Sequence, residues 1–266
     1  KKDIRNRCET EKNFLSYLQS CAVHKTPILL ESNISKGWSL MSWIEGHKPT
    51  ELHASDLEAI AKFITEINDT SNRQARSRLQ PASEACQSLP ILIKCISERI
   101  KRLQSTAPSS KTGQKAVLWI KKSIEPHFRS ISTRLLDIST KKSHWEDLHD
   151  CRIASPSDVG IHNTIRTEQG LHFLDFEYAG LDDLSKLAAD WILQPEHSLN
   201  QQQEEILTRY LTKSMEESIG SSWRSRLDDI KPLIRIKWCL IMLNQLQNNS
   251  LSRGQLDKAM SYFAGV

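Results

Sequence analysis

Apolar residues recur at helical spacing along most of this chain. The first stripe advances by alternating steps of four and three residues, which places its members on one face of a helix: Ile4, Cys8, Glu11, Leu15, Leu18 and Ala22. Glu11 is the charged member of this stripe, and a carboxylate that faces a core is costly unless it is paired. Similar apolar patterns predict further helices over residues 57–67, 89–103, 117–124, 183–193, 205–217, 230–246 and 251–263.

Polar and conformationally special residues punctuate these predicted helices. Ser55 or Asp56 is expected to cap the helix over 57–67. The stretch 105–113 is rich in Ser, Thr, Pro and Gly, so it is expected to be a loop. Pro126 has no backbone N–H to donate, and it should kink or end the helix that precedes it.

Two pairs of short apolar runs have the character of hairpins. Their strands are expected at Pro27–Leu30 with Trp38–Ile44, and around Ile165 with Leu171–Leu174. Turns are expected at Ser35–Gly37 in the first pair and at Gly170 in the second. The pattern therefore predicts an α+β protein that is mostly helical.

Oxygen-bearing side chains gather around the second hairpin. Asp158 is followed five residues later by Asn163, and Asp175 stands at the end of the last strand. Hard oxygen ligands suit Mg²⁺, and a carboxylate can align an acceptor hydroxyl, so this arrangement favours phosphoryl transfer. The alternative is that Asp158 and Asn163 make Asx turns in a loop, with Asp175 merely capping a strand.

The spacing and the hairpin together resemble the aminoglycoside phosphotransferase and choline kinase superfamily, which has a protein-kinase-like fold. The resemblance is carried by Asp158-Val-Gly-Ile-His-Asn163 and by Asp175-Phe-Glu-Tyr178, which is closer to choline and ethanolamine kinases than to protein kinases. Pro156 departs from the pattern, because it stands where the family has the His of His-x-Asp. The resemblance implies two lobes: residues 1–46 as an N-lobe remnant of a helix, strands and a hinge, and residues 47–266 as a helical C-lobe with the catalytic loop and metal-binding hairpin.

The same resemblance assigns roles to the central residues. Asp158 would orient the acceptor hydroxyl and accept its proton, while Asn163 and Asp175 would ligate Mg²⁺. Glu177 would add an outer-shell carboxylate or simply bond to the loop. Asp190 would brace the catalytic loop, unless it is an exposed helical residue. A single His without a spaced partner is more often a loop or core residue, so His162 is given no role.

Nucleotide contacts are expected from the N-lobe. In kinase-like folds, a Glu in the position of Glu11 pairs with a Lys that holds the phosphates; the alternative is that Glu11 reaches water or Arg7. The strand leading to Gly46 resembles the interlobe hinge, so Ser42, Trp43 and Ile44 would contact adenine through their backbone, unless this is a plain hairpin.

The phosphate-covering part of such a lobe is not found in this sequence. Only Lys1, Lys2 and Asp3 precede the first helical stripe, and no Gly occurs before Gly37. Either residues upstream of Lys1 are absent from this chain, or the protein dispenses with a phosphate loop; we expect the former, with the incomplete chain a poor catalyst.

Composition adds constraints on partners and on location. The chain has a net charge of +4 and a pI near 8.7, which suits an anionic nucleotide but is too weak to imply nucleic acid. No signal peptide or membrane span is visible, so no membrane partner is expected. The six cysteines are scattered without a C-x-x-C motif, and a reducing, cytoplasmic setting is expected.

The expected activity is Mg²⁺-dependent transfer of the γ-phosphate of ATP or GTP to a hydroxyl of a small molecule. An amino alcohol or an aminoglycoside-like acceptor is favoured by the acids Glu177, Asp182 and Asp183, with Trp191 and Trp223 nearby, although Asp182 and Asp183 could instead only cap the next helix. The competing hypotheses are a catalytically weak kinase-like module that binds nucleotide, a helical scaffold whose acids are structural, and, more remotely, a nucleic-acid-binding protein.

Overall fold

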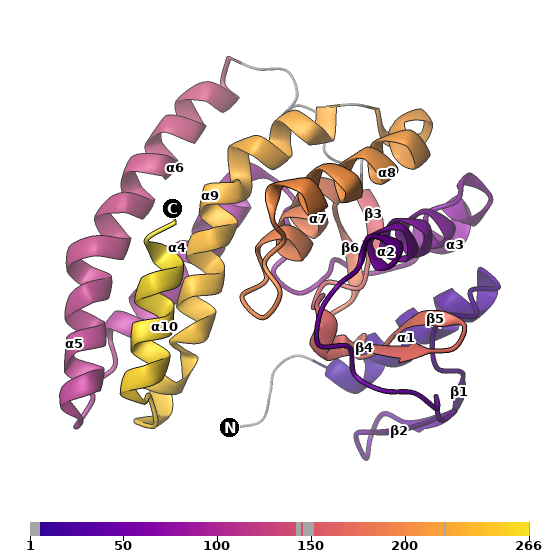
Figure 1. Ribbon diagram of the computed structural model, residues 1–266, viewed down its shortest axis with the longest axis horizontal. Coiled ribbons are helices and arrows are strands. Elements are labelled where there is room, and N and C mark those ends of the chain that lie inside the picture. The colour runs from indigo at the N-terminus through magenta and orange to yellow at the C-terminus, as the bar shows by residue number, and fades with distance from the viewer. Residues whose placement is uncertain (1–5, 142–144, 146–151, 221, 266) are drawn as a thin grey trace. The chain divides into compact units, whose positions relative to one another are not determined.

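The computed structural model describes residues 6–141, 145, 152–220 and 222–265 (Figure 1). The chain forms two compact units, and each of them is assembled from two stretches of sequence. The first contains Lys1–Ala85 and Leu148–Trp223, and the second contains Cys86–Asp147 and Arg224–Val266. The predicted lobe boundary after residue 46 falls inside the first unit and stays a prediction.

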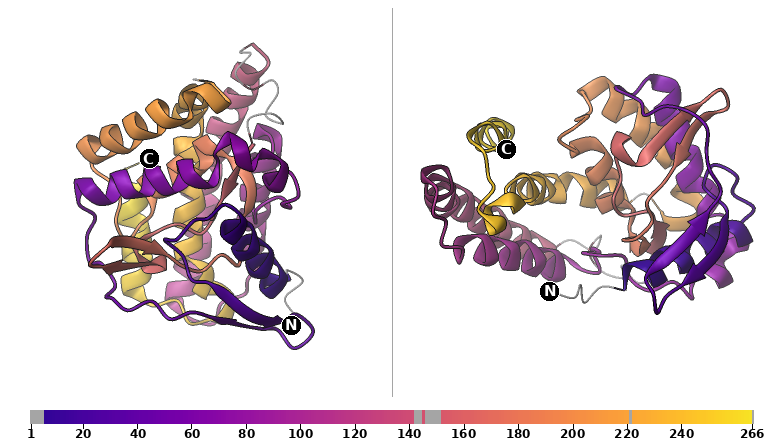
Figure 2. Two further views of the ribbon diagram at one scale, coloured as in Figure 1. Left: turned by 90° about the vertical axis from the view of Figure 1, so that its right-hand side faces the viewer. Right: turned by 90° about the horizontal axis from the view of Figure 1, so that it is seen from below.

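The first unit begins with a helix and a hairpin. Helix α1 (Arg7–Ser20) packs beside the two antiparallel strands β1 (Leu29–Asn33) and β2 (Trp38–Met41), as the left view of Figure 2 shows. Gly37 lies in the left-handed region, with φ of 71°, at the predicted turn. The second strand is shorter than predicted: it ends at Met41, so Ser42, Trp43 and Ile44 follow the strand instead of extending it.

The rest of the first unit is built around helix α2 (Ala54–Ile67). Helix α8 (Gln201–Ile219) packs along it (Figure 2), and Phe63 of α2 stacks on Phe173 with ring centroids 4.1 Å apart. Four short strands form two further antiparallel pairs, and helix α7 follows directly from the last strand. Their bounds are β3 (Arg152–Ser155) with β6 (Gly180–Asp183), β4 (Thr164–Thr167) with β5 (Gly170–Phe173), α3 (Arg73–Arg76) and α7 (Leu184–Leu193).

The second unit is helical throughout its described part. It contains α4 (Leu89–Gln104), α5 (Lys111–Trp119), α6 (Glu125–Ser139), most of α9 (Ser222–Met242) and α10 (Arg253–Phe263). Its core includes five side chains that are almost fully buried: Leu103, Ile120, Leu135, Leu240 and Leu256. Trp119 meets Phe263 edge to face at 5.6 Å, which ties α5 to α10.

Several predicted element boundaries are wrong for identifiable reasons. Helix α2 begins earlier, at Ala54, with His53 as its N-cap; Asp56 acts from the third helical position by accepting the backbone N–H of His53 at 2.7 Å. Residues 111–113 of the predicted loop already belong to α5. Of the two outcomes expected at Pro126, a kink or an end, the end does not occur: a π-helical turn over Ile120–Ile124 leads directly into α6.

Within the described residues, no helix is both long and apolar enough to cross a lipid bilayer.

Candidate functional site

Three of the predicted site residues, Asp158, Asn163 and Asp175, lie in residues 156–179, an excursion of the chain whose two ends are joined by a small sheet. The other predicted site residues lie elsewhere, Glu11 on α1 and residues 42–44 after β2. Strand β3 enters this excursion and β6 leaves it, with Ser155 opposite Gly180. A Cβ on Gly180 would sit 2.3 Å from the carbonyl oxygen of Gln80, so glycine is required where the 80–82 segment crosses the strand. That segment is held by Leu181, whose N–H donates to Gln80 at 2.8 Å. Residues 156–179, including Asp158, Asn163 and Asp175, are therefore anchored at both ends.

The loop that carries Asp158 is braced by the side chains of Asn68 and Ser155. Asn68 donates to the carbonyl oxygen of Ala154 at 2.9 Å and accepts the N–H of the same residue at 2.7 Å. Ser157 adopts a φ of 66°, and its N–H donates to the hydroxyl of Ser155 at 3.1 Å. A non-glycine residue in the left-handed region needs such support, and this kind of strain is common at functional sites.

Asn163 is oriented by its own loop and by the hairpin. Its Nδ2 donates to the backbone carbonyl of Asp158 at 2.9 Å, and its backbone carbonyl accepts the N–H of Leu174 at 2.9 Å. The side chain is buried. Because Nδ2 is used, Oδ1 is the atom left to accept a donor or to ligate a cation.

Asp175 lies after β5 with a φ of 61°, a second non-glycine residue in the left-handed region. Protein atoms crowded around the carboxylate raise the pKa of Asp175, and the negative charges of Glu177 and Asp158 raise it further. The carboxylate of Asp158 is therefore close enough to act on the ionisation of Asp175. The structure thus brings the three central side chains of the prediction into one neighbourhood.

Helix α1 presents a row of side chains to the residues that follow Asp175. Arg7 forms a 2.8 Å ion pair with Glu177, and the Phe14 ring lies 5.4 Å from that of Phe176. Between them, Glu11 lies near the backbone N–H of Phe176, which favours the ionised carboxylate and partly opposes the rise in the pKa of Glu11. Burial raises the pKa of Glu11, and the charge of Asp175 adds to that effect. Among the described residues no basic side chain forms an ion pair with Glu11, so the predicted lysine partner stays a prediction and Arg7 pairs elsewhere.

The balance of charge at this site favours a cation. Glu11, Asp158 and Asp175 contribute three carboxylates, and Arg7 forms its ion pair with Glu177. Within the described part of the chain, no cluster of three or more His, Cys, Asp or Glu side chains has metal-binding geometry. The fit to Mg²⁺ therefore rests on Asp175 together with Oδ1 of Asn163, with other ligands coming from outside the chain, which is the usual way in which Mg²⁺ is held beside nucleotide phosphates.

The three predicted adenine-contacting residues divide into two kinds. The N–H of Ser42 donates to the carbonyl of Ile28 at 2.9 Å, and its hydroxyl accepts the N–H of Ile28 at 2.8 Å, so the backbone N–H of Ser42 is not available to a ligand. Trp43 is 85% exposed, and it and Ile44 make no backbone hydrogen bond to the rest of the described chain. The chain then passes through Gly46, and His47 pairs with Arg166 of β4, so this segment is tied to the hairpin of β4 and β5.

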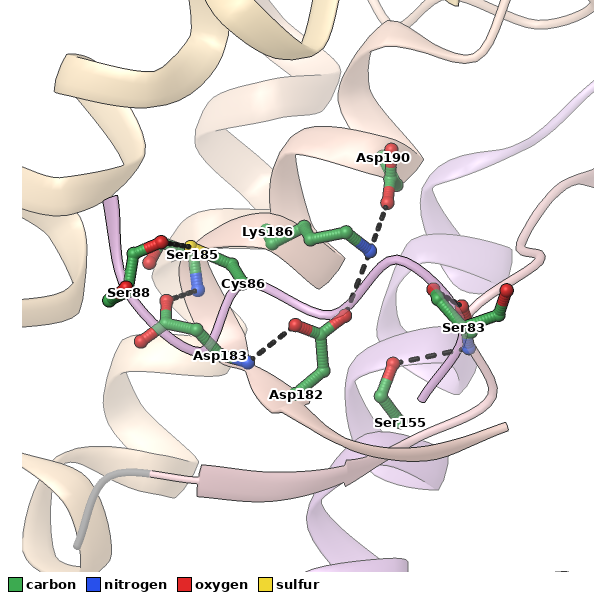
Figure 3. A network of polar contacts seen from close by, with 10 residues as sticks. Ser83, Cys86, Ser88, Ser155, Asp182, Asp183, Ser185, Lys186 and Asp190 are labelled. Carbon is green, nitrogen blue, oxygen red and sulfur yellow. Dashed lines mark hydrogen bonds and ion pairs between the residues drawn. The ribbon is translucent and has the colours of Figure 1, made fainter. Parts of the chain in front are cut away.

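The acidic residues predicted to attract a cationic acceptor have structural roles instead. Asp182 is buried and bonded to Lys186 at 2.8 Å, while Asp183 caps α7 by accepting the N–H of Ser185 at 2.7 Å (Figure 3). The helix-capping alternative is therefore correct for Asp183. Trp191 and Trp223 are almost fully buried and present no open aromatic face.

Lys186 is the centre of a buried charge cluster next to the site. It reaches from α7 to Asp182 and, at 3.1 Å, to Asp190 (Figure 3). Burial alone would lower the pKa of Lys186, but the two carboxylates more than offset that effect and raise it. Asp190 is only 1% exposed, so the interpretation of Asp190 as an exposed helical residue is wrong.

Sequence reasoning missed His162. Its Nε2 lies 3.6 Å from Oδ1 of Asp158, and its Nδ1 faces Gln194 at 3.1 Å and Glu196 at 3.6 Å. The signal that could have found it is local: His162 is four residues after Asp158, just beyond Gly160. Its partners Gln194 and Glu196 come from beyond α7, and only the fold reveals them.

Comparisons with known proteins define the fold. No protein-family model and no curated protein sequence matches the chain. An ethanolamine kinase from Plasmodium vivax superposes with a TM-score of 0.64 at 14% identity, over 100% of this chain and 72% of that one. A choline/ethanolamine kinase family protein from Mesorhizobium loti gives 0.63 at 18% identity, over 99% and 78%. The AMP-bound spectinomycin phosphotransferase APH(9)-Ia gives 0.63 at 14% identity, over 97% and 80%.

At these identities the likeness concerns the fold alone. The chain has the mixed α+β, kinase-like fold of the choline/ethanolamine kinases and the aminoglycoside phosphotransferases, so the predicted fold class and resemblance are confirmed.

Proposed function

We propose that this protein is a Mg²⁺-dependent phosphotransferase that moves the γ-phosphate of ATP or GTP to a hydroxyl of a small molecule. The observation that carries the proposal is the convergence of Asp158, Asn163 and Asp175 within one anchored excursion, with two strained backbone positions and an excess of negative charge. Such a site suits a reaction in which catalysis is mostly positioning and charge stabilisation.

Each central residue has a part in the proposed reaction. The Asp158 carboxylate holds the acceptor O–H and takes its proton as the new O–P bond forms and the bond to the leaving diphosphate breaks. Asp175 and Oδ1 of Asn163 would hold Mg²⁺, which when bound neutralises charge on the phosphates. Nδ2 of Asn163 donates to the backbone carbonyl of Asp158, and this hydrogen bond would hold the acceptor-binding residue and the metal ligand at fixed positions relative to each other.

The nucleotide is proposed to lie along the segment 42–44 and beside α1. Trp43 and Ile44 offer backbone groups for a purine, whereas the Ser42 N–H is already used by Ile28 and is withdrawn from that role. Glu11 adds negative charge to the site, since its carboxylate is close enough to interact with that of Asp175.

An amino alcohol or an aminoglycoside-like compound is the proposed acceptor class. Structures with this fold include an ethanolamine kinase and the complex of gentamicin with APH(2″)-IIa, whose TM-score here is 0.59 at 13% identity. The half-exposed side chain of Glu196, beside His162 and near Asp158, would place a negative charge where an acceptor amine could approach.

The test is a phosphorylation assay with Mg-ATP and Mg-GTP. Acceptors are ethanolamine, choline, spectinomycin and gentamicin, with glucose as a neutral comparison. Asp158→Asn should reduce turnover by about 10²-fold or more, the contribution of a general base, while Mg-nucleotide affinity stays unchanged. The matched control is Asp137→Asn, which removes an exposed carboxylate on α6 that pairs with Lys141.

Two results would count against the proposal in different ways. Near-normal turnover of Asp158→Asn would remove Asp158 from the role of base. Metal-dependent nucleotide binding by the wild type without any product would instead favour a nucleotide-binding module.

A further inference from the structure

His162 lies between the carboxylate of Asp158 and a loop that follows α7. Its Nε2 is 3.6 Å from Asp158 Oδ1, and its side chain is 25% exposed. This separation is within ion-pair range and longer than a hydrogen bond. Catalytic hydrogen bonds are often long in unliganded enzymes and shorten when the substrate binds, so a small movement of either side chain would close the contact.

The hydrogen-bonding partners of Gln194 determine which ring nitrogen of His162 carries the proton. Gln194 Oε1 accepts the backbone N–H of Glu196, which fixes the orientation of the amide. The amide therefore turns Nε2, a donor, toward His162 Nδ1 at 3.1 Å. Glu196 Oε2 also faces Nδ1, but at 3.6 Å it is beyond hydrogen-bond distance, so the nearer amide makes Nδ1 the acceptor of the neutral ring. Nε2 then carries the hydrogen and faces Asp158.

Gly160 makes room for this arrangement. A Cβ at Gly160 would lie 2.5 Å from both Cε1 and Nδ1 of His162, and 3.1 Å from Gln194 Nε2. The backbone there is extended, with φ of 160° and ψ of 169°, so the requirement for glycine is one of space and not of conformation.

We propose that His162 is a positioning residue for Asp158: its Nε2–H orients the carboxylate that receives the acceptor proton. Two hydrogen bonds hold the ring in place for this role, one from the Glu196 N–H to Gln194 and one from Gln194 to His162. This inference rests on the proposed function, because orientation matters only if Asp158 acts on an acceptor. It assigns to His162 a bracing role in a loop where Pro156 occupies the usual place of a bracing histidine.

The competing explanation is that His162 only packs the loop against Gln194. The two explanations can be distinguished because the side-chain amide of Gln or Asn can take the place of one ring nitrogen each. The Nε2 of a Gln lies near that of His, so His162→Gln keeps a donor toward Asp158. The shorter Asn reaches only the Nδ1 position, so His162→Asn keeps a partner for Gln194 and loses the contact to Asp158.

Steady-state kinetics with Mg-ATP and the best acceptor of the panel above provide the first test. His162→Ala should lower kcat about ten- to a hundredfold, the size of one hydrogen bond to a charged group, with the KM for ATP unchanged. His162→Gln should recover most of this loss, and His162→Asn should not. Recovery by Asn and not by Gln would overturn the positioning role, and so would a loss confined to the KM for ATP.

A double-mutant cycle gives the control for Gly160. Gly160→Ala should lower kcat on its own, because the new methyl group displaces the His162 ring. In the His162→Ala background the same change should add little, since the ring is gone. Full additivity of the two changes would contradict the proposed coupling.

The ring itself can be examined without any acceptor. The ¹⁵N chemical shifts of the histidine side chains, recorded at pH 9 and assigned by comparison with His162→Gln, should show the proton of His162 on Nε2. A proton on Nδ1 would overturn the inference whether or not the protein is an enzyme. A wild type that phosphorylates none of the acceptors would overturn the proposed function and this role with it, whereas an active wild type with an unaffected His162→Ala variant would overturn the role of His162 alone.

Discussion

Two groups of carboxylates lie in the same compact unit and differ in burial and in how their charge is balanced. Asp182 and Asp190 are buried to within 1% of full exclusion from solvent, and the protein supplies Lys186 between them. Glu11 and Asp175 are not buried, and partial burial raises the pKa of each; the charge of Asp175 raises that of Glu11 further, and the charges of Glu177 and Asp158 raise that of Asp175. The first group is neutralised by the chain itself. Within the described residues the second group is not neutralised by an ion pair, so it is suited to a positive charge from outside the protein.

This difference separates a structural role from a functional one. A buried ion cluster is needed for the integrity of the native state, because removal of one partner leaves an isolated charge in a poorly solvated place. A site with unbalanced carboxylates loses stability when empty and regains it with its ligand. The two groups should therefore respond in opposite directions when one charged residue is neutralised.

The largest expected effect is at Lys186. Lys186→Met should lower the free energy of unfolding by about 3–5 kcal/mol, because Asp182 and Asp190 lose the ammonium group that balances their charge. Urea denaturation monitored by circular dichroism measures the change. Lys62→Met, which removes the exposed partner of Glu66, is the control and should change stability by about 0–1 kcal/mol. An equal effect of the two substitutions would contradict the distinction between the groups.

A smaller effect of opposite sign is expected at Glu11. Because the folded-state pKa of Glu11 is raised above its unfolded value, the folded protein binds more protons between the two values, and stability falls as the pH rises through that window. Glu11→Gln keeps the size and polarity of the side chain and removes the charge. It should raise the free energy of unfolding by roughly 0.5–1 kcal/mol above the window and leave it unchanged below the ordinary carboxyl pKa of about 4.3.

The matched control for that prediction lies on the same helix. Glu9 is exposed on α1, and Glu9→Gln makes the same change of charge away from Asp175. Thermal denaturation of both variants from pH 4 to pH 8, without Mg²⁺, gives the comparison. A Glu11→Gln variant that is less stable than the wild type at pH 8 would mean that a positive partner already compensates Glu11.

Local sequence patterns predicted the hairpin of β4 and β5 and most of the helices. Gly170, with φ of 100°, turns the hairpin where its sequence position indicated, and the spacing of Asp158, Asn163 and Asp175 was sufficient to place them around it. These features depend on residues close together in the chain, where turn chemistry and apolar periodicity act directly.

The missed features depend on partners that are distant in sequence. Strands β3 and β6 are four residues each and pair across the whole excursion, so neither has a local signal of its own. The N-cap of α2 is His53 and not one of the strong capping residues nearby, because Asp56 closes a capping box from inside the helix. His162 was visible in the sequence, but its meaning comes from Gln194, 32 residues later.

The central claim, that the site is built for a metal-bound nucleotide, is tested most directly by calorimetric titration of ATP in the presence and absence of Mg²⁺. The wild type and Asp175→Asn should be compared at pH 8. The account predicts that wild-type binding depends on Mg²⁺, and that Asp175→Asn reduces the Mg²⁺-dependent affinity about tenfold or more, the loss expected when one charged ligand contact is removed. Equal ATP affinity with and without Mg²⁺, unchanged by Asp175→Asn, would contradict it.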